Sequence, residues 1–97
     1  MNNLSVKQRQ ALKGLAHNLD PVVMIGDKGV TPAVIKEVET SLTAHELIKI
    51  RVFGDDRAVR LAAIDEICTQ TSAQLVQHIG KLIVLYRPSE KNKISLK

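Results

Sequence analysis

Apolar residues recur at helical spacing in three segments of the chain, each preceded by residues suited to begin a helix. Ser5 and Gln8 form a capping box before the first segment, which ends before Leu19. Thr31 with Pro32, and Asp55 with Asp56, precede the other two, which predict helices from Pro32 to about Thr43 and from Arg57 to about Gln70. The expected buried stripes are Ala11, Leu12, Leu15 and Ala16; Val34, Ile35, Val38 and Leu42; and Leu61, Ile64, Ile67 and Cys68.

Four shorter apolar segments predict β-strands. Residues 22–25 form a continuous apolar run between Pro21 and Gly26, which predicts a buried strand. Residues 47–53 alternate, so we expect one face to carry Ile48, Ile50 and Val52, and the other to carry Leu47, Lys49, Arg51 and Phe53. Residues 74–78 and 82–86, joined by a turn at 79–81, predict a closing hairpin whose last strand is central.

The resulting order, α-β-α-β-α-β-β, predicts a two-layer α/β domain with a mixed four-stranded sheet. The unit from residue 22 to residue 53 is expected to be a right-handed parallel crossover. A chain of 97 residues fits a single domain spanning residues 1–97, with a mobile tail from about residue 88. The pattern fixes neither the strand order nor the side of the sheet taken by the first helix.

Composition narrows the class of partner. The chain has 14 Lys and Arg against 10 Asp and Glu, a net charge of +4, which favours an anionic partner such as nucleic acid. Phe53 and Tyr86 are its aromatic residues, too few for the stacking platforms of an RRM or of aromatic single-strand binders. A single cysteine, no secretory signal and no apolar run of membrane-spanning length predict a cytoplasmic protein without a membrane partner.

Positive charge gathers in the first helix, the loop after the first strand, the second strand and the C-terminal end. A basic surface built by several elements favours nucleic-acid binding over a solvated stripe on one helix. Lys49 and Arg51 have an alternative interpretation, because charges also protect an edge strand from aggregation.

The loop Gly26-Asp27-Lys28-Gly29 lies between a predicted strand and a predicted helix. Its glycines permit positive φ, the helix that follows favours anions at its N-terminus, and Lys28 adds a cation. The spacing excludes a P-loop and a dinucleotide-binding loop. It fits either a phosphate-contacting loop or a tight strand-to-helix turn, with Asp27 pointing away from phosphate or capping the loop.

No assembled catalytic or metal-binding set is visible, so we expect no enzyme, no metal, no cofactor and no small-molecule substrate. His17, His45 and His78 lack Cys or carboxylate partners at ligand spacing. Cys68 lies on a predicted buried stripe, and Asp56 lies where a helix cap belongs.

Several segments together resemble the CRM domain (chloroplast RNA splicing and ribosome maturation). Residues 21–31 resemble its glycine-loop signature, 45–50 its second-strand motif, 79–81 and 84–88 its closing hairpin, and 13–17 its first helix. The length matches the family's bacterial stand-alone, YhbY-type members. The resemblance implies the α-β-α-β-α-β-β fold, which is similar to the C-terminal domain of translation initiation factor three. It also implies binding to ribosomal RNA in precursor large ribosomal subunits, whose assembly the protein would aid.

The resemblance further implies that the glycine loop and neighbouring basic residues touch RNA, and we expect a monomer that docks on the phosphate backbone. The expected contact residues are Gly26, Asp27, Lys28, Gly29, Lys7, Arg9, Lys13, Lys49, Arg51, Lys81 and Arg87. One alternative is a protein-interaction module that docks on a ribosomal protein or assembly factor through an apolar patch such as Leu47 and Phe53 beside Val30. Another is a small-anion or nucleotide-binding domain.

Overall fold

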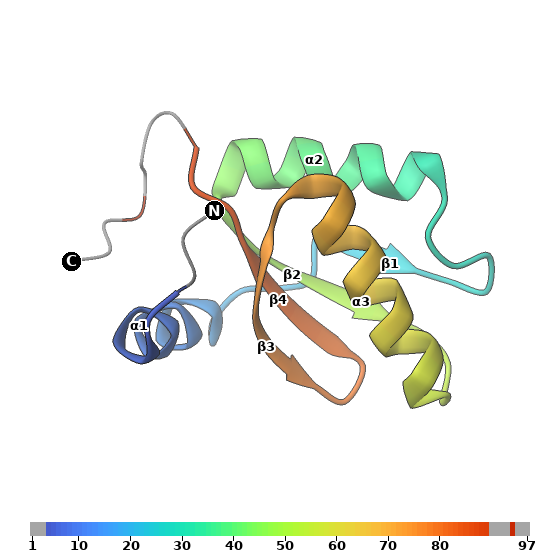
Figure 1. Cartoon of the computed structure of the whole chain (residues 1–97), viewed down its shortest axis with the longest axis horizontal. Coiled ribbons are helices and arrows are strands. Elements are labelled where there is room, and N and C mark those ends of the chain that lie inside the picture. The colour runs from blue at the N-terminus through green and yellow to red at the C-terminus, as the bar shows by residue number, and fades with distance from the viewer. Residues whose placement is uncertain (1–3, 90–93, 95–97) are drawn as a thin grey trace.

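The computed structural model describes residues 4–89 and residue 94, and these contain the predicted order of elements (Figure 1). The helices are α1 (Val6–Ala16), α2 (Pro32–His45) and α3 (Arg57–Thr71), and the strands are β1 (Val23–Ile25), β2 (Leu47–Val52), β3 (Gln74–Ile79) and β4 (Leu82–Tyr86). The mixed sheet and the closing hairpin are confirmed. No helix in the described part of the chain is long and apolar enough to cross a membrane.

The predicted caps begin the helices as expected. Ser5 and Gln8 form the capping box of α1, and the Thr31 hydroxyl accepts a hydrogen bond from the Val34 N–H at 3.2 Å. The Asp56 carboxylate accepts one from the Ala58 N–H at 2.9 Å. Each cap therefore provides an acceptor for an N–H of the first turn, which would otherwise lack a partner within the helix.

The strand order in the sheet is β1-β2-β4-β3. β1 pairs with β2 in parallel, whereas β4 pairs antiparallel with both β2 and β3. β4 is therefore central, as predicted. β2 is also an interior strand, so the interpretation of Lys49 and Arg51 as protection of an edge strand is wrong.

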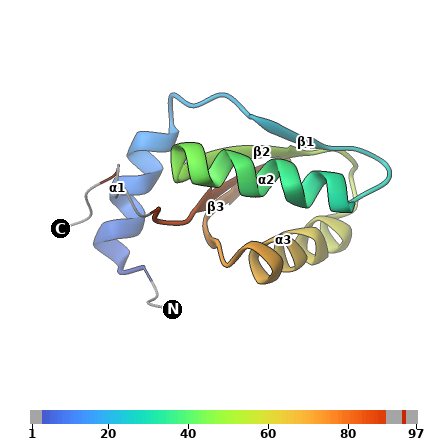
Figure 2. The same ribbon diagram turned by 90° about the horizontal axis from the view of Figure 1, so that it is seen from above.

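The two faces of the sheet are covered unequally. α2 and α3 pack side by side on one face, where they form the larger core with alternate residues of the strands (Figure 2). This core includes Val38, Leu42, Ile48, Ile50, Ile64, Ile67, Ile83 and Leu85. α1 packs on the other face, where Leu12 and Ala16 meet Leu47, Val84 and Tyr86 near the start of β2 and the end of β4. The rest of that face is not covered by a helix.

This unequal cover explains where the burial predictions are wrong. Met24 is 59% exposed, because its face of β1 has no helix above it, so β1 alternates and is not buried throughout. Ala11 and Leu15 are exposed because α1 contacts the sheet through a narrow stripe. Leu61 is expected in the buried stripe of α3 but is 45% exposed. Ala63 is buried instead, beside Ile64 and Ile67 on the same helix.

The C-terminal segment returns to the start of β2. Most of the predicted mobile tail, residues 90–93 and 95–97, lies outside the described residues. Ser89 and Ile94 are described, and their N–H groups donate to the carboxylate of Glu46 at 3.0 and 2.9 Å. Ile94 also packs against the smaller core beneath α1.

Candidate nucleic-acid interface

On the sheet face opposite α2 and α3, the interior strand β2 carries two cations, half-buried Lys49 beside α1 and exposed Arg51. Lys49 and Arg51 are two residues apart on β2. Their side chains therefore point to the same face, and their Cα atoms lie about 7 Å apart. Arg51 is exposed and lies in register between Met24 of β1 and Leu82 of β4. Neither cation forms an ion pair with a described residue. Their charge is therefore available to a ligand lying on this face.

The glycine loop is a tight turn whose tip is exposed. The Gly29 N–H donates to the Gly26 carbonyl at 3.0 Å, and Asp27 and Lys28 stand at the tip. Gly29 has φ +69°, a conformation that favours glycine, but Gly26 does not have positive φ. A Cβ added at Gly26 would meet no atom within 4 Å. The backbone therefore requires only the second of the two glycines.

The loop leads directly into α2, as Figure 1 shows. Pro32 has no N–H, and Thr31 already accepts from the N–H of Val34. Two donors of the first turn are thereby removed or satisfied by the chain itself. The attraction that the loop offers to an anion then comes mainly from Lys28 and the helix dipole.

Two backbone hydrogen bonds place the loop at the same end of the sheet as the β3–β4 turn. The Phe53 N–H donates to the Ile25 carbonyl at 2.9 Å, and the Val52 N–H donates to the Lys81 carbonyl at 2.8 Å. The Lys81 ammonium lies 3.3 Å from the carboxylate of Asp55, but both side chains are well exposed. Such a surface ion pair is weak, so phosphate can compete for Lys81.

The predicted basic residues of α1 have different surroundings. Lys13 lines a groove beside the sheet together with Lys49, and Lys7 is exposed. Arg9 instead points to β3, where its guanidinium donates to the backbone carbonyls of Leu75 and Val76, the latter at 3.3 Å. Arg9 thus joins α1 to the sheet.

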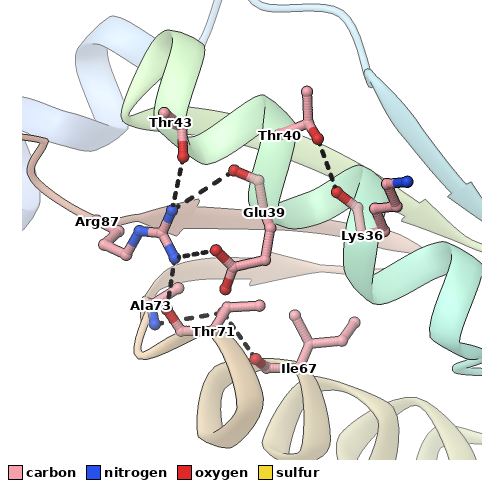
Figure 3. A network of polar contacts seen from close by, with 8 residues as sticks. All are labelled: Lys36, Glu39, Thr40, Thr43, Ile67, Thr71, Ala73 and Arg87. Atoms are coloured by element: carbon pink, nitrogen blue, oxygen red, sulfur yellow. Dashed lines mark hydrogen bonds and ion pairs between the residues drawn. The ribbon is translucent and has the colours of Figure 1, made fainter.

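Arg87 lies in a network of polar contacts that joins α2 to the end of α3 (Figure 3). Its guanidinium donates to the Glu39 carboxylate and to the Thr71 carbonyl, both at 2.8 Å, and to the Thr43 hydroxyl at 3.1 Å. The structure therefore gathers Lys13, Lys28, Lys49, Arg51 and Lys81 on the uncovered face and its adjoining end. It leaves Arg9 and Arg87 in contacts within the fold.

The other candidate chemistries have little support in the geometry. No three His, Cys, Asp or Glu side chains among the described residues come together as a metal-binding group. Burial raises the pKa of the Cys68 thiol, and Asp65 raises it further, so this thiol is less ionised than an exposed one. Leu47 is only 5% exposed because it faces α1, so the apolar patch suggested for protein docking does not form.

Glu46 is a buried structural residue that no pattern in the sequence singled out. It ends α2 with φ +66° and is fully buried, and its carboxylate accepts hydrogen bonds from both the N–H and the hydroxyl of Ser89. The same carboxylate contributes, after burial, to a raised pKa of Tyr86. No local pattern distinguishes such a glutamate from an exposed one, because its partners lie more than 40 residues away.

Known proteins are similar to this chain over nearly its whole length. Residues 4–87 match the family model described as the CRS1 / YhbY (CRM) domain. An RNA-binding protein of Haemophilus influenzae is 53% identical over 99% of this chain and 97% of its own length. Probable RNA-binding proteins of Pseudomonas aeruginosa and Bacillus subtilis are 39% and 37% identical, over 91% and 93% of this chain and 85% and 94% of theirs.

The fold also matches a solved structure. The solution structure of a hypothetical protein from Staphylococcus aureus superposes with a TM-score of 0.85 at 38% identity. The match covers 98% of this chain and all of the other. The segment matched by the family model, residues 4–87, contains every helix and strand of the described residues.

Proposed function

The chain belongs to the CRS1 / YhbY (CRM) domain family, and from this membership we propose that it is an RNA-binding protein that binds ribosomal RNA in precursor large ribosomal subunits and aids their assembly. The relatives described above are named as an RNA-binding protein and as probable RNA-binding proteins. The ribosomal target rests on the resemblance of the motifs to the family. The interface rests on the geometry of this chain.

The observation that carries the proposal is the pair Lys49 and Arg51 on the uncovered face of an interior strand. An interior strand needs no charges to prevent edge pairing, and neither side chain has an ion-pair partner among the described residues. Two such cations side by side are suited to successive phosphates of a nucleic-acid backbone.

Lys28 and Lys81 extend this basic surface to the end of the sheet. Lys28 stands at the exposed tip of the glycine loop, and Lys81 lies in the β3–β4 turn. Phosphate contacts of this kind fix the position and orientation of an RNA without reading its sequence. The proposed mechanism is therefore electrostatic docking on a folded RNA, in which shape decides where the protein binds.

Charge reversal tests this interface. We expect the double variant Lys49→Glu/Arg51→Glu to bind a large-subunit ribosomal RNA fragment at least about tenfold more weakly, and Lys28→Glu several-fold more weakly. Lys36→Glu, an exposed position on α2, is the matched control and should stay within about twofold. Binding is measured by fluorescence anisotropy, with thermal unfolding to confirm that each variant folds. If Lys28→Glu binds as tightly as the wild type, the glycine loop is only a structural turn and does not contact RNA. If the double variant binds as tightly as the wild type, the proposed interface is wrong.

Sedimentation of cell extracts tests the proposed target. We expect the protein to travel with precursors of the large subunit and to be released by nuclease. Association that survives nuclease would favour the alternative, docking on a ribosomal protein or another assembly factor.

A further inference from the structure

A groove of about 410 Å³ lies between α1 and the uncovered face of the sheet. Its wall on the helix side includes Gln10, Lys13 and His17. Its floor is formed by the sheet, with Lys49 from β2 and with Leu82 and Val84 from β4. Gln77 and Ile79 of the edge strand β3 line the far side, where Ile79 is 59% exposed.

The lining combines three kinds of group. Leu82, Val84 and Ile79 offer an apolar surface, Gln10 and Gln77 offer amide donors and acceptors, and Lys13 and Lys49 offer positive charge. No residue that lines the groove is acidic. A ligand that fits this lining has a flat apolar face, an edge able to form hydrogen bonds, and a negative charge beside it.

A ribonucleotide has these features. Sequence-specific RNA-binding proteins commonly take unpaired bases out of the stack and form hydrogen bonds with their edges. Side-chain amides can form such bonds, because they both donate and accept. The volume is within the range of small-ligand sites, so it can hold one nucleotide. A second groove, lined by Leu15, Leu19, Val22 and Leu47, includes Asp20 and fewer polar groups, so it is less suited to this ligand.

We propose that the groove between α1 and the sheet accepts one unstacked RNA base, with the adjoining phosphate on Lys13 and Lys49. This inference rests on the proposed RNA-binding function and adds a base contact to an otherwise backbone-directed interface. The base lies on aliphatic side chains, which explains how the protein can hold it without an aromatic platform. The side-chain amide of Gln77 on β3 forms hydrogen bonds with the edge of the base, and Ile79 packs against the face of the base.

Paired RNA probes separate base contact from phosphate contact. The first probe is an octamer of adenosines, and the second has the same length and charge but carries abasic nucleotides at all eight positions. We expect the wild-type protein to bind the intact octamer about five- to tenfold more tightly, the size of effect that one added hydrogen bond and its apolar contact produce. Fluorescence anisotropy of end-labelled probes gives both affinities under one salt condition.

Two variants assign this preference to the groove. Gln77→Met removes the amide while keeping the length of the side chain, and Ile79→Ala shortens an exposed apolar wall, so both should fold. We expect each to reduce the preference for the intact octamer to within about twofold while the affinity for the abasic probe stays unchanged. Gln70→Met and Val59→Ala on α3 are the matched controls, since Val59 is 60% exposed, almost the same fraction as Ile79.

The outcomes are distinct. Equal wild-type affinity for the two probes, or a preference that survives in both groove variants, overturns the base site while RNA binding stands. A loss that is equal for both probes also overturns it, because the groove then holds phosphate alone. If the wild type binds neither octamer nor a ribosomal RNA fragment, the proposed function itself fails.

Discussion

Glu46 shows how one buried side chain holds distant parts of this chain together. Its positive φ is a conformation that costs a non-glycine residue about 1–3 kcal/mol and persists only where the surroundings enforce it. Here the surroundings do so, because its carbonyl accepts from the Arg87 N–H at 2.9 Å and its carboxylate binds Ser89 and Ile94. The end of β4 and the C-terminal segment are thereby fixed to the start of β2.

Replacing Glu46 by glutamine tests this role. Glutamine keeps the shape but turns an amide donor toward groups that already donate, so we expect the free energy of unfolding to fall by about 1–3 kcal/mol. Urea denaturation measures this loss. Glu37→Gln, an exposed position on α2, is the control and should change stability by less than about 0.5 kcal/mol. Equal effects of the two substitutions would show that the carboxylate of Glu46 has no special structural role.

Cys68 provides a second test of how the fold changes the chemistry of a single residue. Burial, and to a smaller degree Asp65, raises the pKa of its thiol above the ordinary value of 9.0. A raised pKa means that the folded state favours the neutral thiol, so its contribution to stability is present below about pH 9 and is lost as pH rises toward the folded pKa. We expect a disulfide reagent at pH 8 to react more slowly with the folded protein than with the urea-unfolded chain, because only thiolate reacts. Equal rates would contradict the burial of this thiol.

At the scale of helices and strands, the sequence predicts elements better than it predicts their surroundings. The caps and the alternation in β2 are local, and both are confirmed. Whether β1 is buried depends on a helix above each face, and whether β2 is an edge depends on where β4 inserts. These are properties of the assembled sheet, so the residues of β1 and β2 alone could not determine them.

α1 has a small apolar contact with the sheet, since Leu12 and Ala16 are its buried residues. Arg9 adds hydrogen bonds to carbonyls of β3, where the pairing with β4 shifts register between Leu75 and Gln77. A β-bulge leaves backbone groups without ladder partners, and the guanidinium can satisfy them.

We therefore expect Arg9→Met to lower the free energy of unfolding by about 1.5–3 kcal/mol, the range for hydrogen bonds from a charged group. Lys7→Met removes the same charge from an exposed position of α1 and should leave stability nearly unchanged. Urea denaturation compares the two, and hydrogen exchange of α1 shows whether the helix loosens. If Lys7→Met destabilises as much as Arg9→Met, charge and not the contact with β3 stabilises the helix.

For the molecule as a whole, the net charge matters less than where the cations that are not bound within the fold lie. The uncovered face and its adjoining end combine Lys13, Lys28, Lys49, Arg51 and Lys81, while Arg9 and Arg87 are bound within the fold. The alternation of β2 predicted that Lys49 and Arg51 share a face. No sequence pattern could separate Arg87 from this set, because its partner Glu39 is 48 residues away and meets it only after folding.

Salt dependence of RNA affinity tests this view of the whole surface. The logarithm of the association constant should fall linearly with the logarithm of salt concentration, with a slope of about −0.7 to −0.9 for each phosphate neutralised. The Lys49→Glu/Arg51→Glu variant should have a shallower slope, equivalent to about one to two fewer neutralised phosphates. Titrations at several salt concentrations provide both slopes. Affinity that is flat between low and moderate salt would contradict electrostatic docking.

The central position of β4 has a consequence for how this protein is made. Chains emerge from the ribosome N-terminus first, so β4 is the last strand to appear although it lies between β2 and β3. Until residues 82–86 are free, β2 has an unpaired edge and β3 has no neighbour in the sheet. The sheet therefore becomes complete only after β4 has emerged, whatever part of the chain has already folded.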